Sequence, residues 1–369
     1  MRDTRVFSPF VDAHELRAEF PVLGRVAYLN AGTDGPLPAR AVRAAGEELE
    51  REAHDGRALS HFERRSELAG ELRSAYAGLL GCDTGDVALT TCTSEGIAQT
   101  INGLGLGPGD EIVTSDEEHP GLLGALSAER QLRGVSVRAV PLRDVADAVG
   151  PRTRLVACSH VGWMSGSEAP TELAQLDVPV LLDGAQGVGA VEVDVGALGC
   201  DAYAGAAQKW LCGPDGAGML YVRASLRERL AVSRRGYANL KDPDAGIDAR
   251  VHEDARCLDA FSLSAEALAC ALAGVGVLAE AGWSAVHARA RDLAALLAGG
   301  VQESERELAP RGQTTLVSFS SADPAEERVR LAREGIIVRN IPGRPWLRAS
   351  VGAWNDENDL DRLLRVLAN

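Results

Sequence analysis

The chain has 369 residues, of which 46 % are hydrophobic and 25 % are charged, as is typical of a globular protein with a sizeable core. Its formal net charge of -15 argues against nucleic acid or an anionic membrane surface as the main partner. No apolar run approaches the roughly 20 residues of a membrane-spanning helix. The N-terminal stretch lacks the apolar region of a signal peptide, so we expect a cytoplasmic location.

Cysteine and histidine spacing gives no sign of a metal site. The seven cysteines include no CxxC pair and most lie in apolar stretches, which predicts reduced and mostly buried thiols. The seven histidines show no ligand spacing such as HExxH, so we expect no bound metal.

Helical patterns and short apolar runs alternate through the first two-thirds of the chain. Residues 41–68 and 71–80 predict two helices, and Gly81 ends the second. Short strands are predicted at residues 87–90, 111–114, 135–140, 154–158, 178–182 and 219–222. Several of these runs are almost wholly apolar, as expected when helices cover both faces of a mainly parallel sheet. The alternation therefore favours an α/β layered domain.

The pattern changes after about residue 233. Residues 234–259 are polar and predict a long loop, and residues 264–281 and 284–298 predict two helices. Shorter elements are expected at residues 315–318, 328–333, 336–339 and 346–350, before a closing helix at 357–367. We therefore expect an N-terminal segment (1–25) that packs with a small domain, a large domain (26–250), and that small C-terminal α/β domain (251–369).

The lysine in AAQKWLCGPDG stands out because lysine is scarce. Of the 38 basic residues, only Lys209 and Lys241 are lysines. An arginine stays protonated, whereas a buried lysine amine can lose its proton and condense with a carbonyl as a Schiff base. Lys209 is therefore a candidate nucleophile, with an ordinary surface lysine as the alternative.

Other reactive residues stand where predicted strands end, which is where open α/β sheets bind ligands. Asp183 ends the run VPVLL and could hold a cationic ring nitrogen, or cap a turn. His119 follows EIVT and could stack on a flat ligand, or merely precede a Pro turn. Thr93 and Ser94 could bind a phosphate before a helix expected near residue 97, or act as its N-cap. With Lys209, these groups are the set that pyridoxal phosphate (PLP) requires.

Seven motifs extend this argument along nearly the whole chain. They are YLNAGTDGPLP (28–38), TTCTSEGI (90–97), GDEIVTSDEEHPG (109–121), SHVGWMSG (159–166), LLDGAQGVG (181–189), DAYAGAAQKWLCGPDGAG (201–218) and WLRASVGAWNDENDLDRLL (346–364). In this order they resemble the class V aminotransferase family of fold-type I PLP enzymes, which includes cysteine desulfurases, cysteine C–S lyases and isopenicillin N epimerase-like proteins. The resemblance implies a large domain with a mostly parallel central sheet sandwiched by helices, a smaller C-terminal α/β domain, and a homodimer with shared active sites.

The resemblance also implies roles toward the cofactor. Lys209 would bind PLP covalently and move the substrate Cα proton, Asp183 would hold the pyridinium N–H, and His119 would stack on the ring. Gln186 would hydrogen-bond the phenolic oxygen. The phosphate contacts would come from Thr93, Ser94 and Gln208, and from Ser262 of the partner subunit, with Ser264 as the alternative. The usual Ser-x-His before the lysine is replaced by Ala206, Ala207 and Gln208, which removes one hydroxyl contact.

Arg348 in WLRAS would bind the carboxylate of a small amino-acid substrate, for which a bidentate guanidinium is suited. Asn30 would approach the substrate from the N-terminal segment. His160 and Trp163 would shape the pocket, although Trp163 could equally be a packing residue. The four motif residues Lys209, Asp183, His119 and Arg348 together argue against a non-catalytic binding protein.

Four reactions compete for this site. A standard cysteine desulfurase needs a mobile Cys before the carboxylate-binding arginine, but the corresponding loop, VRNIPGRPWLR (338–348), contains none. An epimerase needs a second base, and the sequence identifies no residue for that role. We therefore expect Cα deprotonation and β-elimination from cysteine or an S-substituted cysteine. Transamination and isopenicillin N epimerase-like racemisation stay open as alternatives.

Overall fold

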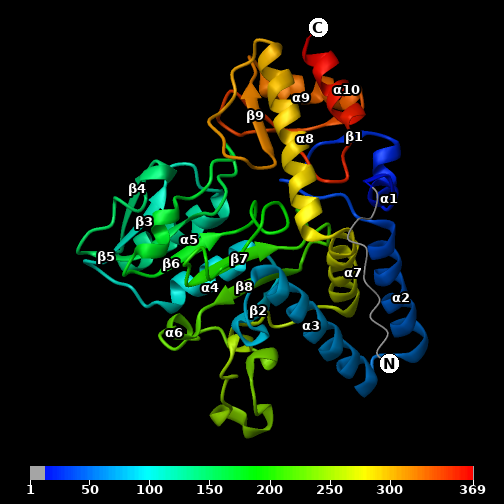
Figure 1. Ribbon diagram of the computed structural model, residues 1–369. Coiled ribbons are helices and arrows are strands. Elements are labelled where there is room, and N and C mark those ends of the chain that lie inside the picture. Colours follow the sequence, from blue (N-terminus) through cyan, green and yellow to red (C-terminus); the bar gives the residue numbers. More distant parts are fainter. Residues whose placement is uncertain (1–12, 369) are drawn as a thin grey trace, which may run out of the picture.

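A seven-stranded sheet forms the centre of the larger part of the molecule, where Figure 1 shows its arrows among the surrounding helices. The structure is a computed structural model that describes residues 13–368. Across the sheet the order is β2 (Val87–Thr90), β8 (Gly218–Val222), β7 (Ala202–Ala206), β6 (Val180–Asp183), β5 (Thr153–Ser159), β3 (Glu111–Ser115) and β4 (Ser136–Val140). β8 is antiparallel to both of its neighbours, and the other pairs are parallel. The predicted mostly parallel sheet is confirmed.

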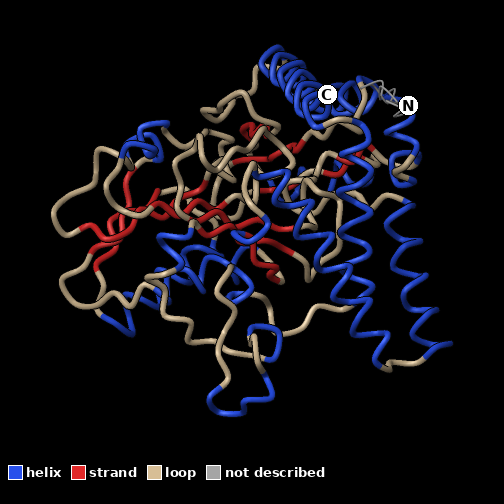
Figure 2. Tube along the Cα trace, turned by 60° about the horizontal axis from the view of Figure 1, so that its bottom comes forward, coloured by secondary structure: helices blue, strands red, loops and turns tan. Residues whose placement is uncertain are grey.

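Helices cover both faces of this sheet (Figure 2). One face carries α3 (Leu59–Leu80) and α7 (Ala265–Ala281), and the other carries α4 (Thr93–Gly103) and α5 (Pro120–Arg133). Successive side chains of a strand point to opposite faces. In β5, Val156 belongs to the hydrophobic cluster that includes residues of α3 and α7, whereas its neighbour Leu155 belongs to the cluster that includes residues of α4 and α5. The strands are apolar on both faces because both faces are buried.

The smaller part is built on a second, antiparallel sheet. Its order is β11 (Arg339–Asn340), β12 (Trp346–Ser350) and β9 (Leu316–Ser320), and α8 (Trp283–Glu303), α9 (Pro324–Arg333) and α10 (Glu357–Leu367) accompany it. β1 (Ala27–Tyr28) pairs with β10 (Ile336–Ile337), so an N-terminal strand lies against the C-terminal part (Figure 1). Arg17 of α1 (Ala13–Ala18) reinforces this contact through Asp359, with an Nη1–Oδ2 distance of 2.7 Å.

The domain boundaries that we expected at residues 25 and 250 stay predictions. Two packing contacts connect regions that these boundaries would separate. β1 shares the hydrophobic core of the C-terminal part, and α7 packs against α3 and α2 (Ala39–Asp55) of the larger part. Residues 1–12 of the expected N-terminal segment lie outside the described residues.

Most elements lie close to where the sequence predicts them. β2, β12 and α10 have the predicted bounds, and residues 234–259 form a loop with short 3-10 turns and one isolated bridge between Leu240 and Val251. Several helix boundaries were predicted wrongly. α8 continues to Glu303, beyond its expected end at residue 298, and the first two long helices do not divide at residues 69–70. The break falls at residues 56–58, where Gly56 adopts φ 74°, and α3 then continues through Gly70. α4 begins at Thr93, four residues before its expected start, so the hydroxyl-rich turn is already helical.

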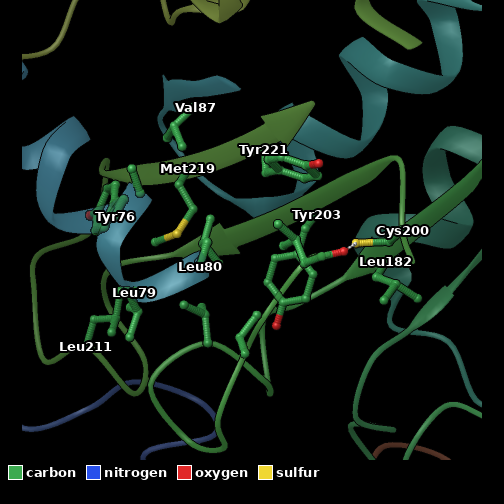
Figure 3. Packing of buried hydrophobic residues seen from close by; sticks show 14 of the residues in the cluster. Tyr76, Leu79, Leu80, Val87, Leu182, Cys200, Tyr203, Leu211, Met219 and Tyr221 are labelled. Carbon is green, nitrogen blue, oxygen red and sulfur yellow. Dashed lines mark hydrogen bonds between the residues drawn. The ribbon is translucent and has the colours of Figure 1, made fainter. Parts of the chain in front are cut away.

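Strand β7 was not predicted, because its sequence AYAGA lacks the bulky apolar residues of a typical strand. In the structure Tyr203 of this strand is fully buried. Figure 3 shows it in the same core layer as Leu182 of β6 and Met219 of β8. This strand matters for function because it leads directly into Lys209.

Three further observations concern cysteines, metals and membranes. All seven cysteines are free and five are buried, as predicted. Within residues 13–368, no group of three or more His, Cys, Asp or Glu side chains is arranged to hold a metal ion. In the same range no single helix has the length and hydropathy to span a membrane. α7 and α8, bent by 83°, meet that criterion together on length and composition alone.

Candidate active site

The predicted site residues follow the carboxyl ends of neighbouring parallel strands. His119 follows β3, His160 and Trp163 follow β5, Asp183 ends β6, and Lys209 follows β7. These four strands run in the same direction, so their ends meet at one edge of the sheet. Ligands bind at this edge in open α/β sheets. The structure therefore brings together residues that span 90 positions of the sequence.

Asp183 is buried and Lys209 is half-buried, and their opposite charges act on each other. Burial lowers the pKa of Lys209, and the charge of Asp183 opposes that effect. Burial likewise raises the pKa of Asp183, and the charge of Lys209 opposes it. Asp183 Oδ1 accepts a hydrogen bond from the Ala185 amide at 3.0 Å. No donor within residues 13–368 reaches its second oxygen, which leaves an acceptor for a protonated ring nitrogen.

His119 is held as a neutral imidazole. As N-cap of α5, its Nδ1 accepts a hydrogen bond from the Gly121 amide at 3.0 Å. Its ring meets that of Trp163 edge to face, with the centroids 5.2 Å apart. Burial, followed by the charges of Lys209, Arg348 and Arg339, lowers the pKa of His119 to about 4. A neutral ring with its orientation fixed in this way suits stacking on a flat ligand.

The start of α4 lies against this histidine turn. A methyl group added at Gly121 would run into Ser94 Oγ and would lie 3.2 Å from His119 Nδ1. Thr93 begins α4, and its buried Oγ1 has no hydrogen-bond partner within the described chain. A helix N-terminus with free hydroxyl groups favours a phosphate.

The N-terminal loop after β1 closes over the segments that carry Gln186 and Lys209. Gln186 Nε2 donates to the Gly32 carbonyl at 2.7 Å, and Gln186 Oε1 accepts from Trp210 Nε1 at 3.0 Å. The Gly35 amide donates to the Gln208 carbonyl at 2.6 Å. One N–H of Gln186 stays available, as its predicted contact with a phenolic oxygen requires.

Arg348 is a buried cation without a carboxylate partner. It is 2 % exposed, and no carboxylate of residues 13–368 lies within 4 Å of its guanidinium. Its Nη1 donates to the Trp163 carbonyl at 2.6 Å and its Nη2 to Thr33 Oγ1 at 3.3 Å, while Nε has no hydrogen-bond partner among residues 13–368. Burial and the charge of Arg339 lower the pKa of Arg348 to about 9. An anionic ligand would relieve this unfavourable burial.

Arg339 of β11 stands directly opposite Arg348 of β12 in the strand register. Like charges in such a position are destabilising. Arg339 has no ion pair within 4 Å with a described residue, and its charge acts on the carboxylate of Asp34 as well as on His119, Lys209 and Arg348. The site therefore presents two guanidinium groups that lack carboxylate partners.

Unpaired buried polar atoms are concentrated at this site, and they provide a test of whether PLP fits. Such atoms are rare in native proteins because each one costs free energy. In the described part of the chain they include Asn30 Oδ1, Thr93 Oγ1, Trp163 Nε1, Gln208 Oε1, Arg348 Nε and Ser350 Oγ. Together with the free oxygen of Asp183 they form a donor and acceptor set that fits PLP and an amino-acid substrate.

Two predicted residues have partners of their own. His160 Nδ1 lies 3.0 Å from Tyr203 Oη, and His160 lines a polar cavity with Glu192 and His287. Ser262 Oγ accepts from Arg65 Nη2 at 3.4 Å, in a surface hollow beside α3. The roles predicted for His160 at the substrate and for Ser262 at the partner's phosphate stay predictions.

Sequence reasoning missed several residues that the structure places at the site. They are Gly32, Asp34, Glu118, Trp210 and Arg339. All five lie inside the quoted motifs or in the loop 338–348, so a signal was present in the sequence. The roles of these residues could not be interpreted from the sequence, because their contacts connect segments that are far apart along the chain.

Comparisons with known proteins show what this chain is similar to. The family model of class V aminotransferases matches residues 27–363. A probable cysteine desulfurase of Methanothermobacter thermautotrophicus is 31 % identical over 72 % of this chain and 68 % of the relative. The isopenicillin N epimerase of Streptomyces clavuligerus is 26 % identical over 96 % of this chain and 98 % of the relative.

Two solved structures of C-DES match almost the whole fold. One is a variant with glycine covalently linked to the PLP cofactor, with a TM-score of 0.90 and 26 % identity over 97 % of this chain and 99 % of that one. The other is the cystine C–S lyase in complex with its reaction product, cysteine persulfide. It has a TM-score of 0.89 and 26 % identity over 95 % of this chain and 99 % of that one.

Proposed function

The chain belongs to the class V aminotransferase family of PLP-dependent enzymes, and on this premise we propose that it removes the β-substituent of cysteine or an S-substituted cysteine by elimination. The observation that carries this choice is the hairpin between β11 and β12. Its five residues, 341–345, contain no cysteine, and no cysteine follows Cys270 in the chain. A thiol that would accept sulfur as a persulfide is therefore missing from the place where a standard desulfurase needs it.

The residues of the site suit the steps of an elimination. Bound PLP supplies an electron sink that stabilises negative charge on the substrate Cα. Arg348 would bind the substrate carboxylate, and Asp183 would hold the proton on the ring nitrogen of the cofactor. Lys209 Nζ would take the Cα proton, and burial lowers the pKa of this amine, which makes a neutral form available.

The elimination needs no oxidant, because all of its electrons and atoms are accounted for. The pair freed at Cα forms a double bond to Cβ, and the thiolate leaves with the electrons of the Cβ–S bond. The leaving group takes up a proton, and hydrolysis of the remaining fragment yields pyruvate and ammonia. With a disulfide substrate the leaving group is a persulfide.

Arg339 points to a substrate with a second carboxylate. We propose that cystine is preferred over cysteine, because its distal carboxylate can bind the guanidinium opposite Arg348. An Arg339→Gln variant should lose about 10-fold or more in kcat/KM for cystine, as expected for a lost charged hydrogen bond, and change little for cysteine. Equal losses for both substrates would contradict this preference.

Epimerisation is the second candidate. Asp34 is exposed at the site, and its charge counteracts the lowering of the Lys209 pKa caused by burial. A carboxylate beside Lys209 could act as the second acid–base group that racemisation requires. Isopenicillin N epimerase from Streptomyces clavuligerus is also similar to this chain over most of its length.

We further propose a cytoplasmic homodimer. Phe62, Tyr237 and Phe261 are exposed around one surface hollow, and Ile247 in the adjoining loop is fully exposed. A second copy of the chain would cover these apolar side chains. Light scattering at micromolar concentration should give twice the monomer mass, and a monomer would refute this part of the proposal.

The deciding experiment compares the two lysines. Lys241 is the matched control because it lies in the 234–259 loop and pairs with Glu253 at 2.7 Å. With PLP added, wild type and Lys241→Ala should show the visible band of covalently bound cofactor, and Lys209→Ala should not. Cystine should then yield pyruvate and persulfide. No visible band in wild type would refute the account of the site.

The same sample separates the alternatives. A change to a pyridoxamine-like spectrum without pyruvate would indicate transamination instead of elimination. Exchange of the Cα proton with solvent deuterium, together with inversion and without pyruvate, would indicate epimerisation. Either result would overturn the proposed reaction and leave the proposed cofactor site intact.

A further inference from the structure

Glu118 is a buried carboxylate beside the site, and the mechanism above does not use it. It is 4 % exposed. Its Oε1 accepts from Ser115 Oγ at 2.5 Å and from the Ser159 amide at 2.8 Å, and its Oε2 accepts from Ser159 Oγ at 2.6 Å. Three hydrogen bonds on one buried side chain indicate a structural requirement at this position.

These bonds connect the ends of two neighbouring strands. Ser115 is the last residue of β3 and Ser159 is the last residue of β5. In the register of β5 and β6, Ser159 stands opposite Asp183. The side chain of Glu118 therefore fixes the end of β3 to the end of β5, and β5 is the neighbour of the strand β6 that ends in Asp183.

The next residue in the chain is His119, the predicted stacking residue. The turn between β3 and α5 is held at its start by the Asp116 amide, which donates to the Val140 carbonyl at 2.9 Å, and at its end by the His119 cap of α5. Glu118 supplies the attachment in between. A connection thus leads from His119 along the chain to Glu118, through the hydrogen bonds of Glu118 to Ser159, and across the strand register to Asp183.

We propose that Glu118 is a positioning residue, which fixes His119 and Asp183 relative to each other so that PLP is held between a stacking ring and a charged carboxylate. The proposal rests on the roles proposed for His119 and Asp183, and it does not depend on which bond of the substrate is broken. Small displacements of such groups lower rates strongly, by about 100-fold for a shift of 1 Å.

The chemistry of this network predicts which substitution will preserve it. Burial raises the pKa of Glu118 to about 7, and the nearby charge of Asp183 adds to this effect. Near neutral pH both protonation states are therefore populated. The two serine hydroxyls can rotate to donate or to accept, so the bonds persist in either state. Glutamine resembles the protonated acid and should keep the connection, whereas alanine should remove it.

The test compares Glu118→Ala, Glu118→Gln and wild type. Glu129 is the matched control, because it is also a buried acid, 1 % exposed, and lies within α5 away from the site. Three quantities are measured: the dissociation constant of PLP, the induced circular dichroism of the bound cofactor, and kcat and KM. The first two need no substrate, so they are independent of the reaction proposed above.

Glu118→Ala should bind PLP at least about 10-fold more weakly, with an altered induced dichroism and a lower kcat at similar KM. Glu118→Gln should lie within about 3-fold of wild type, and Glu129→Gln should match wild type. If Glu118→Ala does not fold, Ser159→Ala replaces it, since it removes one donor and keeps the Ser159 amide. Wild-type PLP affinity and dichroism in folded Glu118→Ala, or in folded Ser159→Ala where that variant replaces it, would overturn the proposal.

Discussion

Replacing Gly32 by alanine tests whether the N-terminal loop shapes the site. Gly32 lies where Gln186, Arg348 and Ser350 converge. A Cβ added at this position would lie 2.8 Å from Ser350 Oγ, 2.9 Å from Arg348 Nη2 and 2.9 Å from Gln186 Oε1. Ordinary contacts begin at 3.4 Å, so all three groups are too close at once. Two of these groups, Arg348 and Gln186, belong to predicted site residues.

The size of the effect follows from these overlaps. Either the loop or the side chains must move by about half an ångström, and overpacking of this kind costs about 1–3 kcal/mol. For a protein of this size that corresponds to a Tm lower by at most several degrees. The displaced Arg348 and Gln186 should reduce kcat/KM by about 10- to 100-fold.

Thermal unfolding and steady-state kinetics with cystine would measure both effects. Gly24→Ala is the matched control, because a Cβ at Gly24 would meet nothing within 4 Å. The control should keep the Tm and the kcat/KM of wild type. If Gly32→Ala behaves like Gly24→Ala, the loop is not packed against the substrate side of the site, and the reasoning from these distances is refuted.

Three further predictions address the carboxylate site, acid sensitivity and a buried ion pair. Arg348→Lys keeps the positive charge but loses the bidentate geometry of the guanidinium. The value of kcat/KM should therefore fall by about 10- to 100-fold through a higher KM, with an unchanged cofactor band. An unchanged KM would contradict the role of Arg348 at the substrate carboxylate. Burial lowers the pKa of His160 from 6.5 to about 4, so the unfolded chain binds a proton in this range and the folded chain does not. Because protons bind to His160 only in the unfolded chain between pH 6.5 and 4, the free energy of unfolding should fall by up to about 3 kcal/mol as the pH falls over this range. Urea titrations should show a smaller pH dependence in His160→Gln, and an equal dependence would argue against a neutral buried His160. Asp259→Ala leaves the buried Arg73, bonded to Asp259 at 2.7 Å, without a carboxylate partner, although its Nη1 still donates to the Val87 carbonyl. This loss should cost about 3–5 kcal/mol in the same assay; a loss below about 1 kcal/mol would contradict this.

Local chemistry accounts for the elements that were predicted correctly. β2 and α10 have the predicted bounds because a short apolar run and an N-cap Asp356 with its capping box are signals confined to a few residues. The strand AYAGA was missed because Tyr203 is the only bulky residue in it, and the neighbouring strands and helices determine that the segment is extended and buried.

Parts of the candidate site were predictable for a similar reason. Lys209, Asp183, His119 and Arg348 could be identified because their residue types suit a specific chemistry and recur in motifs of known order. Arg339 could not be identified, because one arginine among many acquires meaning only when the strand register sets it opposite Arg348. Glu118 was inside a quoted motif, yet its bonds reach Ser159, 41 positions away.

The sequence alone determined the family, the cofactor and the type of chemistry available, because these depend on which side chains are present and on their order. The sequence alone also shows that no cysteine follows Cys270. The tertiary structure alone decided which charges lack a partner, which polar atoms are buried without one, and which side chains connect His119 to Asp183. These properties depend on distances between segments, and such distances arise only when the sheet brings the ends of its strands together.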